Sequence, residues 1–129
     1  MNKLTLSPGE SPVKTLVVDD HPNTANTLAR AIAQLGNGVN VVSATSGSEA
    51  LAQVTDGAAD ILITDMIMPE MTGLELIEKL NSHSSGRPTF SFLMTAYDKT
   101  IAERYLCLSG ERRNNNEKDK NRPFHVGNY

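Results

Sequence analysis

Short runs of apolar residues alternate along the chain with longer segments in which apolar residues recur every three or four positions. Four of the runs are expected to be strands, and these are residues 15–18, 39–44, 61–64 and 89–94. Four of the longer segments are expected to be helices, and these are residues 22–35, 48–54, 73–80 and 98–108. The first run is continuously apolar, which is typical of a parallel strand buried on both faces. The alternation therefore predicts an α/β fold in which helices connect the strands of a parallel sheet.

The two ends of the chain lack this pattern. Residues 1–12 contain two prolines and a glycine, with few large aliphatic side chains, so they are expected to be a flexible leader. Residues 13–110 are expected to form the single domain. Residues 111–122 contain no apolar side chain and cannot be a buried strand. The segment 111–129 is therefore expected to be polar, with the composition of a solvated or disordered chain.

Composition narrows the classes of function. The chain has 129 residues, enough for one domain, and its 12 Lys and Arg against 15 Asp and Glu give a net charge of -3. No basic footprint for nucleic acid is visible in that balance. No apolar run approaches the length of a membrane-spanning helix, the first residues lack a secretion signal, and the single Cys107 cannot form an internal disulfide. These features predict a cytoplasmic protein without direct binding to nucleic acid or membrane.

Polar residues with reactive side chains follow three of the predicted strands. Asp19 and Asp20 follow the first strand and Asp65 follows the third, whereas Thr95 ends the fourth. In a parallel sheet the carboxyl ends of the strands meet at one edge, where reactive groups collect. Two carboxylates about 4 Å apart repel by about 1 kcal/mol in water and about 4 kcal/mol at an effective dielectric constant of 20, so such a cluster needs a cation. Oxygen ligands alone favour Mg²⁺, and Mg²⁺ implies phosphoryl chemistry.

Each of these residues also has an ordinary structural explanation. Asp20 precedes His21 and Pro22 and could cap the helix that begins there, and Asp65 could cap a turn. Thr95 could simply end a strand, because threonine favours strands. These explanations are stronger for one acid alone than for three acids at the ends of two strands.

Three motifs follow one another along the chain, and these are LVVDDHP at 16–22, ILITDMIMPEMTG at 61–73 and FLMTAY at 92–97. Together they resemble the receiver domain of two-component response regulators over about residues 13–110. The resemblance implies a flavodoxin-like (βα)5 fold, a doubly wound parallel sheet with strand order 2-1-3-4-5. Family members have a fifth strand that ends in a Lys-Pro pair, and residues 111–129 lack that pattern. The fifth strand and the last helix are therefore expected to be atypical or missing.

The resemblance implies a role for each acid. Asp65 resembles the phosphoacceptor, a carboxylate that becomes an aspartyl phosphate. Asp19 and Asp20 resemble the acids that bind Mg²⁺, and Asp65 itself and the backbone carbonyl of Ile67 would complete the protein ligands. His21 is expected to be exposed at the start of a helix, at a position that lies near the metal in the family. Mg²⁺ is therefore the expected cofactor.

The resemblance also implies contacts with the phosphoryl group. Thr95 resembles the hydroxyl that turns toward this group after transfer, and the backbone N–H of Ala96 would donate to the same oxygens. The family's lysine has no clear counterpart, because the expected position falls in the polar tract. Three candidates for the missing cation are Arg122, Lys118 and Lys120.

The function that the resemblance implies is a signalling switch rather than a metabolic enzyme. A histidine kinase or a phosphotransfer protein would phosphorylate Asp65, and an output partner or a second copy of the chain would recognise the change. An alternative is a pseudo-receiver that keeps the fold and signals through protein contacts without phosphorylation. A phosphatase of the haloacid-dehalogenase type is a more distant alternative, because Asp65-Met66-Ile67 does not supply the D-x-D motif of that family.

Overall fold

The computed structural model describes residues 3–54, 57, 59–82, 88–95 and 124–128. The strands are β1 (Val13–Val18), β2 (Val39–Ala44), β3 (Ile61–Asp65), β4 (Phe90–Thr95) and β5 (Phe124–Asn128). The helices are α1 (Pro22–Ala33), α2 (Gly47–Val54) and α3 (Gly73–Ser82). Each of them coincides closely with a predicted element except β5, which no apolar run predicted. The helix expected at 98–108 lies outside the described residues.

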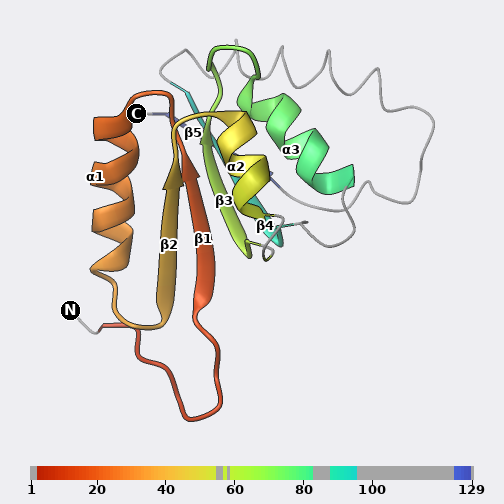
Figure 1. The fold of residues 1–129 in the computed structure, drawn as a ribbon. Helices are drawn as coiled ribbons and strands as arrows, with labels where there is room; N and C mark the ends of the chain where they lie inside the picture. The colour runs from red at the N-terminus through yellow and green to blue at the C-terminus, as the bar shows by residue number, and fades with distance from the viewer. Residues whose placement is uncertain (1–2, 55–56, 58, 83–87, 96–123, 129) are drawn as a thin grey trace.

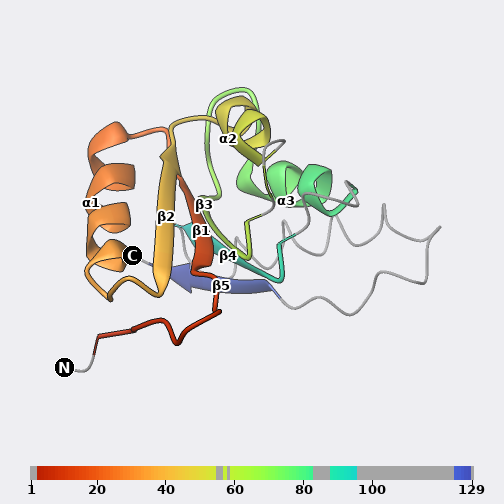
Figure 2. The ribbon, with the colours of Figure 1, turned by 60° about the horizontal axis from the view of Figure 1, so that its bottom comes forward.

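The strands form one parallel sheet in the order β2-β1-β3-β4-β5. This order confirms the doubly wound, flavodoxin-like topology for the part of the chain that the structure describes. Figure 1 and Figure 2 show α1 on one face of the sheet and α2 and α3 on the other. The residues between β4 and β5 lie outside the description, and β5 itself is a short strand of five residues beside β4.

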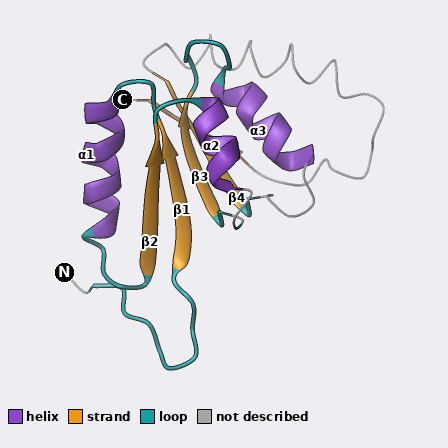
Figure 3. Ribbon diagram, in the orientation of Figure 1, coloured by secondary structure: helices purple, strands orange, loops and turns teal. Residues whose placement is uncertain are grey.

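The main core lies between the sheet and the helices α2 and α3 (Figure 3). Its fully buried side chains include Leu62 and Leu93 from the strands and Leu76, Ile77 and Leu80 from α3. Strands and helices therefore both contribute side chains to one apolar layer. Burial of this apolar surface is the dominant favourable contribution to folding. Three methionines after β3 are also buried in this layer, as expected for adaptable packing residues, and they are Met66, Met68 and Met71.

The first helix ends earlier than the sequence predicted. α1 ends at Ala33, and Leu35 follows the helix with 43% of its surface exposed. The helix expected over residues 22–35 is therefore two residues too long at its C-terminal end, and Leu35 belongs to the connection that follows α1. No helix among the described residues is long and apolar enough to span a membrane.

The leader segment contacts the connection between α1 and β2. The amide of Leu4 donates to the carbonyl of Leu35, and the amide of Gly38 donates to the carbonyl of Leu4 at 3.2 Å. Gly36 allows this approach, because its φ of 134° suits glycine and a β-carbon there would collide with the backbone of Leu4. The sequence interpretation did not foresee these contacts, because backbone pairing leaves no signature in the side chains of residues 1–12.

Candidate metal centre

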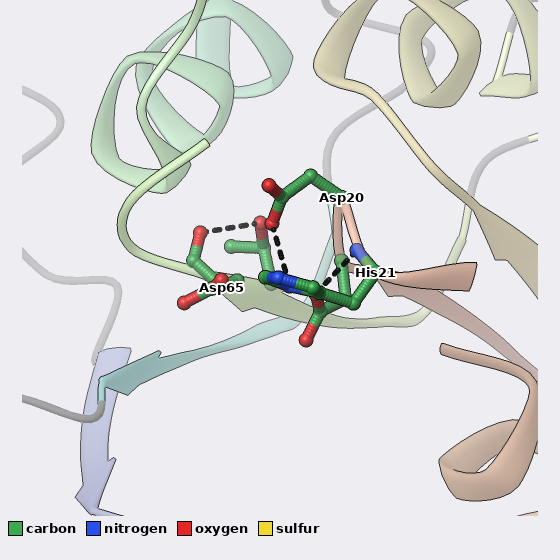
Figure 4. Close-up of polar contacts among 5 residues, drawn as sticks. Asp20, His21 and Asp65 are labelled. Carbon is green, nitrogen blue, oxygen red and sulfur yellow. Dashed lines mark hydrogen bonds and ion pairs between the residues drawn. The ribbon is translucent and has the colours of Figure 1, made fainter. Parts of the chain in front are cut away.

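Four side chains gather where β1 and β3 end. The parallel register pairs Val18 of β1 with Thr64 of β3. The residues that follow them, Asp19 and Asp65, therefore lie at the same edge of the sheet. Asp19, Asp20, His21 and Asp65 each offer one ligand atom, and these atoms all lie within 4.8 Å of one another. Figure 4 shows Asp20, His21 and Asp65 converging from the ends of the two neighbouring strands. The three acids predicted from the sequence are therefore together.

Asp19 is the most deeply buried acid of the cluster. Only 1% of its surface is exposed, and its backbone amide donates to the carbonyl of Ala44 on β2 at 3.1 Å. Its Oδ1 accepts a hydrogen bond from the backbone amide of His21 at 2.9 Å. A buried carboxylate needs such donors, because burial removes the water that would otherwise solvate it. These contacts hold the carboxylate at the carboxyl edge of β1.

Asp20 does not cap α1, contrary to the structural explanation considered for it. The N-cap residue is His21, no side chain caps the helix, and Pro22 occupies the first turn, where its missing amide costs nothing. The side chain of Asp20 is 25% exposed, yet its Oδ1 is buried and accepts no hydrogen bond within the described part of the chain. The nitrogen Nδ1 of His21 lies 3.2 Å from this oxygen, so positive charge already faces it, and a bound cation would satisfy it further.

Asp65 ends β3 and is held by the loop that follows it. Its side chain is nearly buried, and its carbonyl accepts a hydrogen bond from the hydroxyl of Thr64 at 3.1 Å. The amide of Met66 donates to the carbonyl of Met94 on β4, and the amide of Gly73 donates back to the carbonyl of Met66. The first residue of α3, Gly73, is therefore hydrogen-bonded to the residue that follows Asp65.

The loop between Asp65 and α3 contains a tight turn and a capping box. Glu70 has a φ of 67°, and the amide of Met71 donates to the carbonyl of Pro69 at 2.7 Å, which closes a three-residue turn. Thr72 then caps α3, because its hydroxyl accepts from the amide of Glu75 while the Glu75 carboxylate accepts from the amide of Thr72. The sequence interpretation missed this capping box, although the T-x-x-E spacing before an apolar helix is visible in the sequence.

The remaining predicted residues have different outcomes. Thr95 ends β4 with 1% exposure and follows Met94, which pairs with Asp65 across the sheet. Ile67 lies in the loop after β3 with its side chain exposed, and the role of its carbonyl stays a prediction. Ala96 lies outside the described residues. The three candidate cations also lie outside them, and they are Arg122, Lys118 and Lys120.

The charge of the cluster acts on His21. Its Nδ1 lies 3.2 Å from Oδ1 of Asp19 and 3.2 Å from Oδ1 of Asp20, although its side chain is 74% exposed. The hydrogen bond with Asp19 raises the pKa of His21 above its ordinary 6.5, and the negative charge of Asp20 raises it further. The cluster thus stabilises positive charge at its own edge.

The donor set fits a magnesium ion. Carboxylate oxygens are the ligands that Mg²⁺ prefers, and the ion keeps several waters when only a few carboxylates bind it. Atoms at opposite corners of an octahedron with bonds of about 2.1 Å lie about 4.2 Å apart, which is close to the 4.8 Å that bounds the cluster. The buried Oδ1 of Asp20 accepts no hydrogen bond within the described residues and lies 3.2 Å from Nδ1 of His21, and a divalent ion would balance its charge more fully than the imidazole does. The residues present therefore fit the cofactor that the sequence predicted.

The fold and this cluster define a doubly wound α/β domain with an acidic ligand site at the carboxyl edge of its sheet. The chain belongs to the response regulator receiver domain family, whose sequence pattern matches residues 15–109. Receiver domains are signalling switches of two-component systems.

Curated relatives and solved structures agree with this assignment. The probable transcriptional regulatory protein TcrX of Mycobacterium tuberculosis is 37% identical over 87 residues, which cover 67% of this chain and 36% of that protein. The sensor protein EvgS of Escherichia coli K12 is 40% identical over 81 residues, 63% of this chain and 7% of that protein. The chain therefore spans about a third or less of the length of these two relatives.

Two solved structures share the fold. Chemotaxis protein CheY4 of Vibrio cholerae has a TM-score of 0.68 at 26% identity, covering 78% of this chain and 82% of that one. The response regulator TrrA of Thermotoga maritima, crystallised with Mg²⁺ and BeF, has a TM-score of 0.63 at 26% identity, covering 88% of this chain and 84% of that one. A relative of this fold thus holds Mg²⁺ together with a fluoride of beryllium.

Proposed function

We propose that this chain accepts a phosphoryl group on Asp65 in a Mg²⁺-dependent reaction. The observation that carries the proposal is the position of Asp65, whose carboxylate lies within 4.8 Å of ligand atoms from Asp19, Asp20 and His21 at the end of β3. A nucleophilic carboxylate beside a cation-binding pair is the arrangement that aspartyl phosphate formation requires.

Each side chain has a separate task in this proposal. A carboxylate oxygen of Asp65 forms the new bond to phosphorus, while the bond from phosphorus to the donor's histidine nitrogen breaks and that nitrogen keeps the electron pair. Asp19 and Asp20 hold the cation against the site. Mg²⁺, when bound, neutralises charge that develops on the phosphoryl oxygens. The backbone carbonyl of Ile67 is the proposed fourth protein ligand.

The switch would begin at β4. The buried hydroxyl of Thr95 stands at the end of the strand that pairs with β3, so it is the proposed group that turns toward the new phosphate. The amide of Ala96 and a cation from Arg122, Lys118 or Lys120 would contact the same oxygens.

The donor would be a histidine kinase or phosphotransfer protein in the cytoplasm. A phosphate adds close to two negative charges, which is enough to bias the surface that an output partner or a second copy of the chain recognises. The chain's contribution would be that of a switch rather than of an enzyme that turns over a metabolite.

Labelling at a single residue tests the proposal. The protein is incubated with acetyl phosphate, with and without Mg²⁺, and its intact mass is measured. We expect an added phosphoryl group that requires Mg²⁺ and is lost in Asp65→Asn. Asp60→Asn is the matched control. Asp60 immediately precedes β3, at the end of the strand opposite Asp65, and it is exposed. It accepts a hydrogen bond from the amide of Lys14 that an asparagine oxygen can still accept.

The alternative functions predict other outcomes. A pseudo-receiver would bind Mg²⁺ and remain folded without being labelled in the wild-type protein. Labelling that persists in Asp65→Asn would place the acceptor at another residue. Either result would contradict the proposal.

A further inference from the structure

His21 is the member of the cluster to which the proposed phosphorylation gives no task. Its Nδ1 lies 3.2 Å from one oxygen of Asp19 and 3.2 Å from one oxygen of Asp20. Its backbone is fixed as well, because its amide donates to Asp19 at 2.9 Å and Pro22 follows it. The backbone hydrogen bond to Asp19 and the two contacts of Nδ1 therefore place the imidazole beside the proposed metal-binding acids.

The spacing of the three atoms suits ligands of one ion. Atoms on neighbouring corners of an octahedron with bonds of about 2.1 Å lie about 3.0 Å apart. The two distances from Nδ1 to the carboxylate oxygens are both 3.2 Å, so Nδ1 can occupy a corner next to each of them after a small adjustment. The ring also keeps 74% of its side-chain surface exposed, so the neighbouring residues that the structure describes leave it room for this adjustment.

An imidazole ligand changes which ion a carboxylate site prefers. Mg²⁺ is a hard ion that takes oxygen ligands and gains little from nitrogen. Co²⁺, Ni²⁺ and Zn²⁺ bind imidazole well and bind mixed nitrogen and oxygen sites more tightly than Mg²⁺ does. A site of three carboxylates and one imidazole is therefore expected to prefer transition ions over Mg²⁺, in relative affinity, more strongly than a site of three carboxylates alone.

We propose that His21 is a specificity-determining metal ligand, whose Nδ1 joins the carboxylates of the cluster and favours a divalent transition ion over Mg²⁺. The inference rests on the proposed function, because it uses the same acids. It adds that the ion bound at this site depends on the supply of both Mg²⁺ and a transition metal.

Calorimetric titration with Co²⁺ and with Mg²⁺ tests the ligand directly. In His21→Ala we expect the affinity for Co²⁺ to fall by at least about tenfold, since even groups that only orient a ligand change metal affinity by about 10 to 100-fold. We expect the affinity for Mg²⁺ to change much less, because oxygen ligands hold that ion. His21 makes no side-chain capping bond, so the variant should keep α1.

Two controls separate this site from other histidines and from the acids. The chain has three histidines, so His83→Ala and His125→Ala are titrated in parallel and should leave the tight Co²⁺ site unchanged. In an Asp19→Asn background, His21→Ala should lose most of its further effect, because neighbouring ligands of one ion are coupled.

A spectroscopic measurement reports the bond itself. Mn²⁺ is bound to protein carrying ¹⁵N-labelled histidine, and pulsed electron paramagnetic resonance is used to detect a coupled histidine nitrogen. We expect the coupling in the wild type and in the two control variants, and its loss in His21→Ala. A merely structural role for His21 would not produce this signal.

The outcomes for His21 and for Asp65 can be told apart. Co²⁺ affinity that is unchanged in His21→Ala, together with intact Mg²⁺-dependent labelling, would overturn the role of His21 and leave the phosphoacceptor in place. Absence of the histidine coupling in the wild type would do the same. Failure of the wild-type protein to be labelled, with Co²⁺ still bound through His21, would overturn the phosphoacceptor and keep the metal ligand.

Discussion

At the residue scale, His21 is expected to link the protonation of the candidate site to its occupation by a cation. The ring lies against two carboxylates, and a proton on it supplies part of the positive charge that these acids need. A divalent ion supplies twice that charge at the same place. Proton and metal are therefore expected to compete, because each is attracted by the same carboxylates.

This competition predicts a pH dependence with a definite sign. The folded-state pKa of His21 is raised above 6.5 by Asp19 and Asp20, so protonation favours the folded state. That contribution is fully present below the unfolded pKa of about 6.5 and is lost as the pH rises through the folded value. Titration of the imidazole by NMR should give a midpoint above 6.5 without metal and a lower midpoint with Mg²⁺.

The matched variant for this titration is Asp19→Asn. It removes the charge of the largest contributor while leaving an oxygen that can still accept a hydrogen bond, so the midpoint should move toward 6.5. A wild-type midpoint at or below 6.5 in the absence of metal would contradict the electrostatic account of the cluster.

At the element scale, two glycines begin helices on the same side of the sheet and differ in what surrounds them. A β-carbon at Gly73 would overlap with the backbone carbonyl of Asp65 and approach Cδ1 of Leu93 to 2.8 Å. A β-carbon at Gly47 would meet the flexible side chain of Met71, with its Sδ at 2.6 Å. Backbone cannot give way as a methionine can, because methionine has several rotatable bonds. A side chain is therefore tolerated less well at Gly73, where α3 begins, than at Gly47, where α2 begins.

Gly73→Ala is consequently expected to cost more stability than Gly47→Ala. Overpacking of this kind costs about 1 to 3 kcal/mol, and we expect Gly73→Ala near the upper end of that range. The change should also reduce labelling of Asp65, because the displaced carbonyl belongs to that residue. Urea unfolding of both variants measures the difference, and equal losses would show that the loop after β3 adapts.

The elements differ in how well the sequence predicted them, for physical reasons. β1 and β3 are buried strands whose apolar runs lead directly into acids, so both the strands and the position of Asp19 and Asp65 could be predicted. β5 could not, because Phe124–Asn128 is a short edge strand that follows a polar tract and offers no apolar run. Its pairing with β4 is a backbone property that side-chain patterns do not encode.

The sequence likewise predicted some parts of the candidate site and not others. Acids at strand ends are visible in the sequence, whereas the 3.2 Å contacts of His21 depend on how the chain turns from β1 into α1. The N-cap without a side-chain bond also excluded a helix-capping role for Asp20, which the sequence left open.

At the scale of the whole molecule, the candidate metal site joins two central strands. Asp19 and Asp20 follow β1 and Asp65 ends β3, and these strands lie side by side in the middle of the five-stranded sheet. Without a cation the acids repel across that junction. A bound cation would instead attract the acids of both strands and so hold the ends of β1 and β3 together. Because such an ion binds only the folded arrangement, it would stabilise the entire domain.

Mg²⁺ is therefore expected to raise the unfolding temperature of the whole chain. At a concentration 100 times the dissociation constant, binding contributes about 2.7 kcal/mol, which corresponds to roughly 10 °C for a domain of this size. Asp19→Asn should lose most of this increase, because it removes the most buried ligand, whereas Glu10→Gln in the leader should keep it. Scanning calorimetry with Mg²⁺ and with NaCl of equal ionic strength distinguishes binding from screening. An equal increase in both salts would mean that the acids are relieved by general screening and that the cluster holds no specific ion.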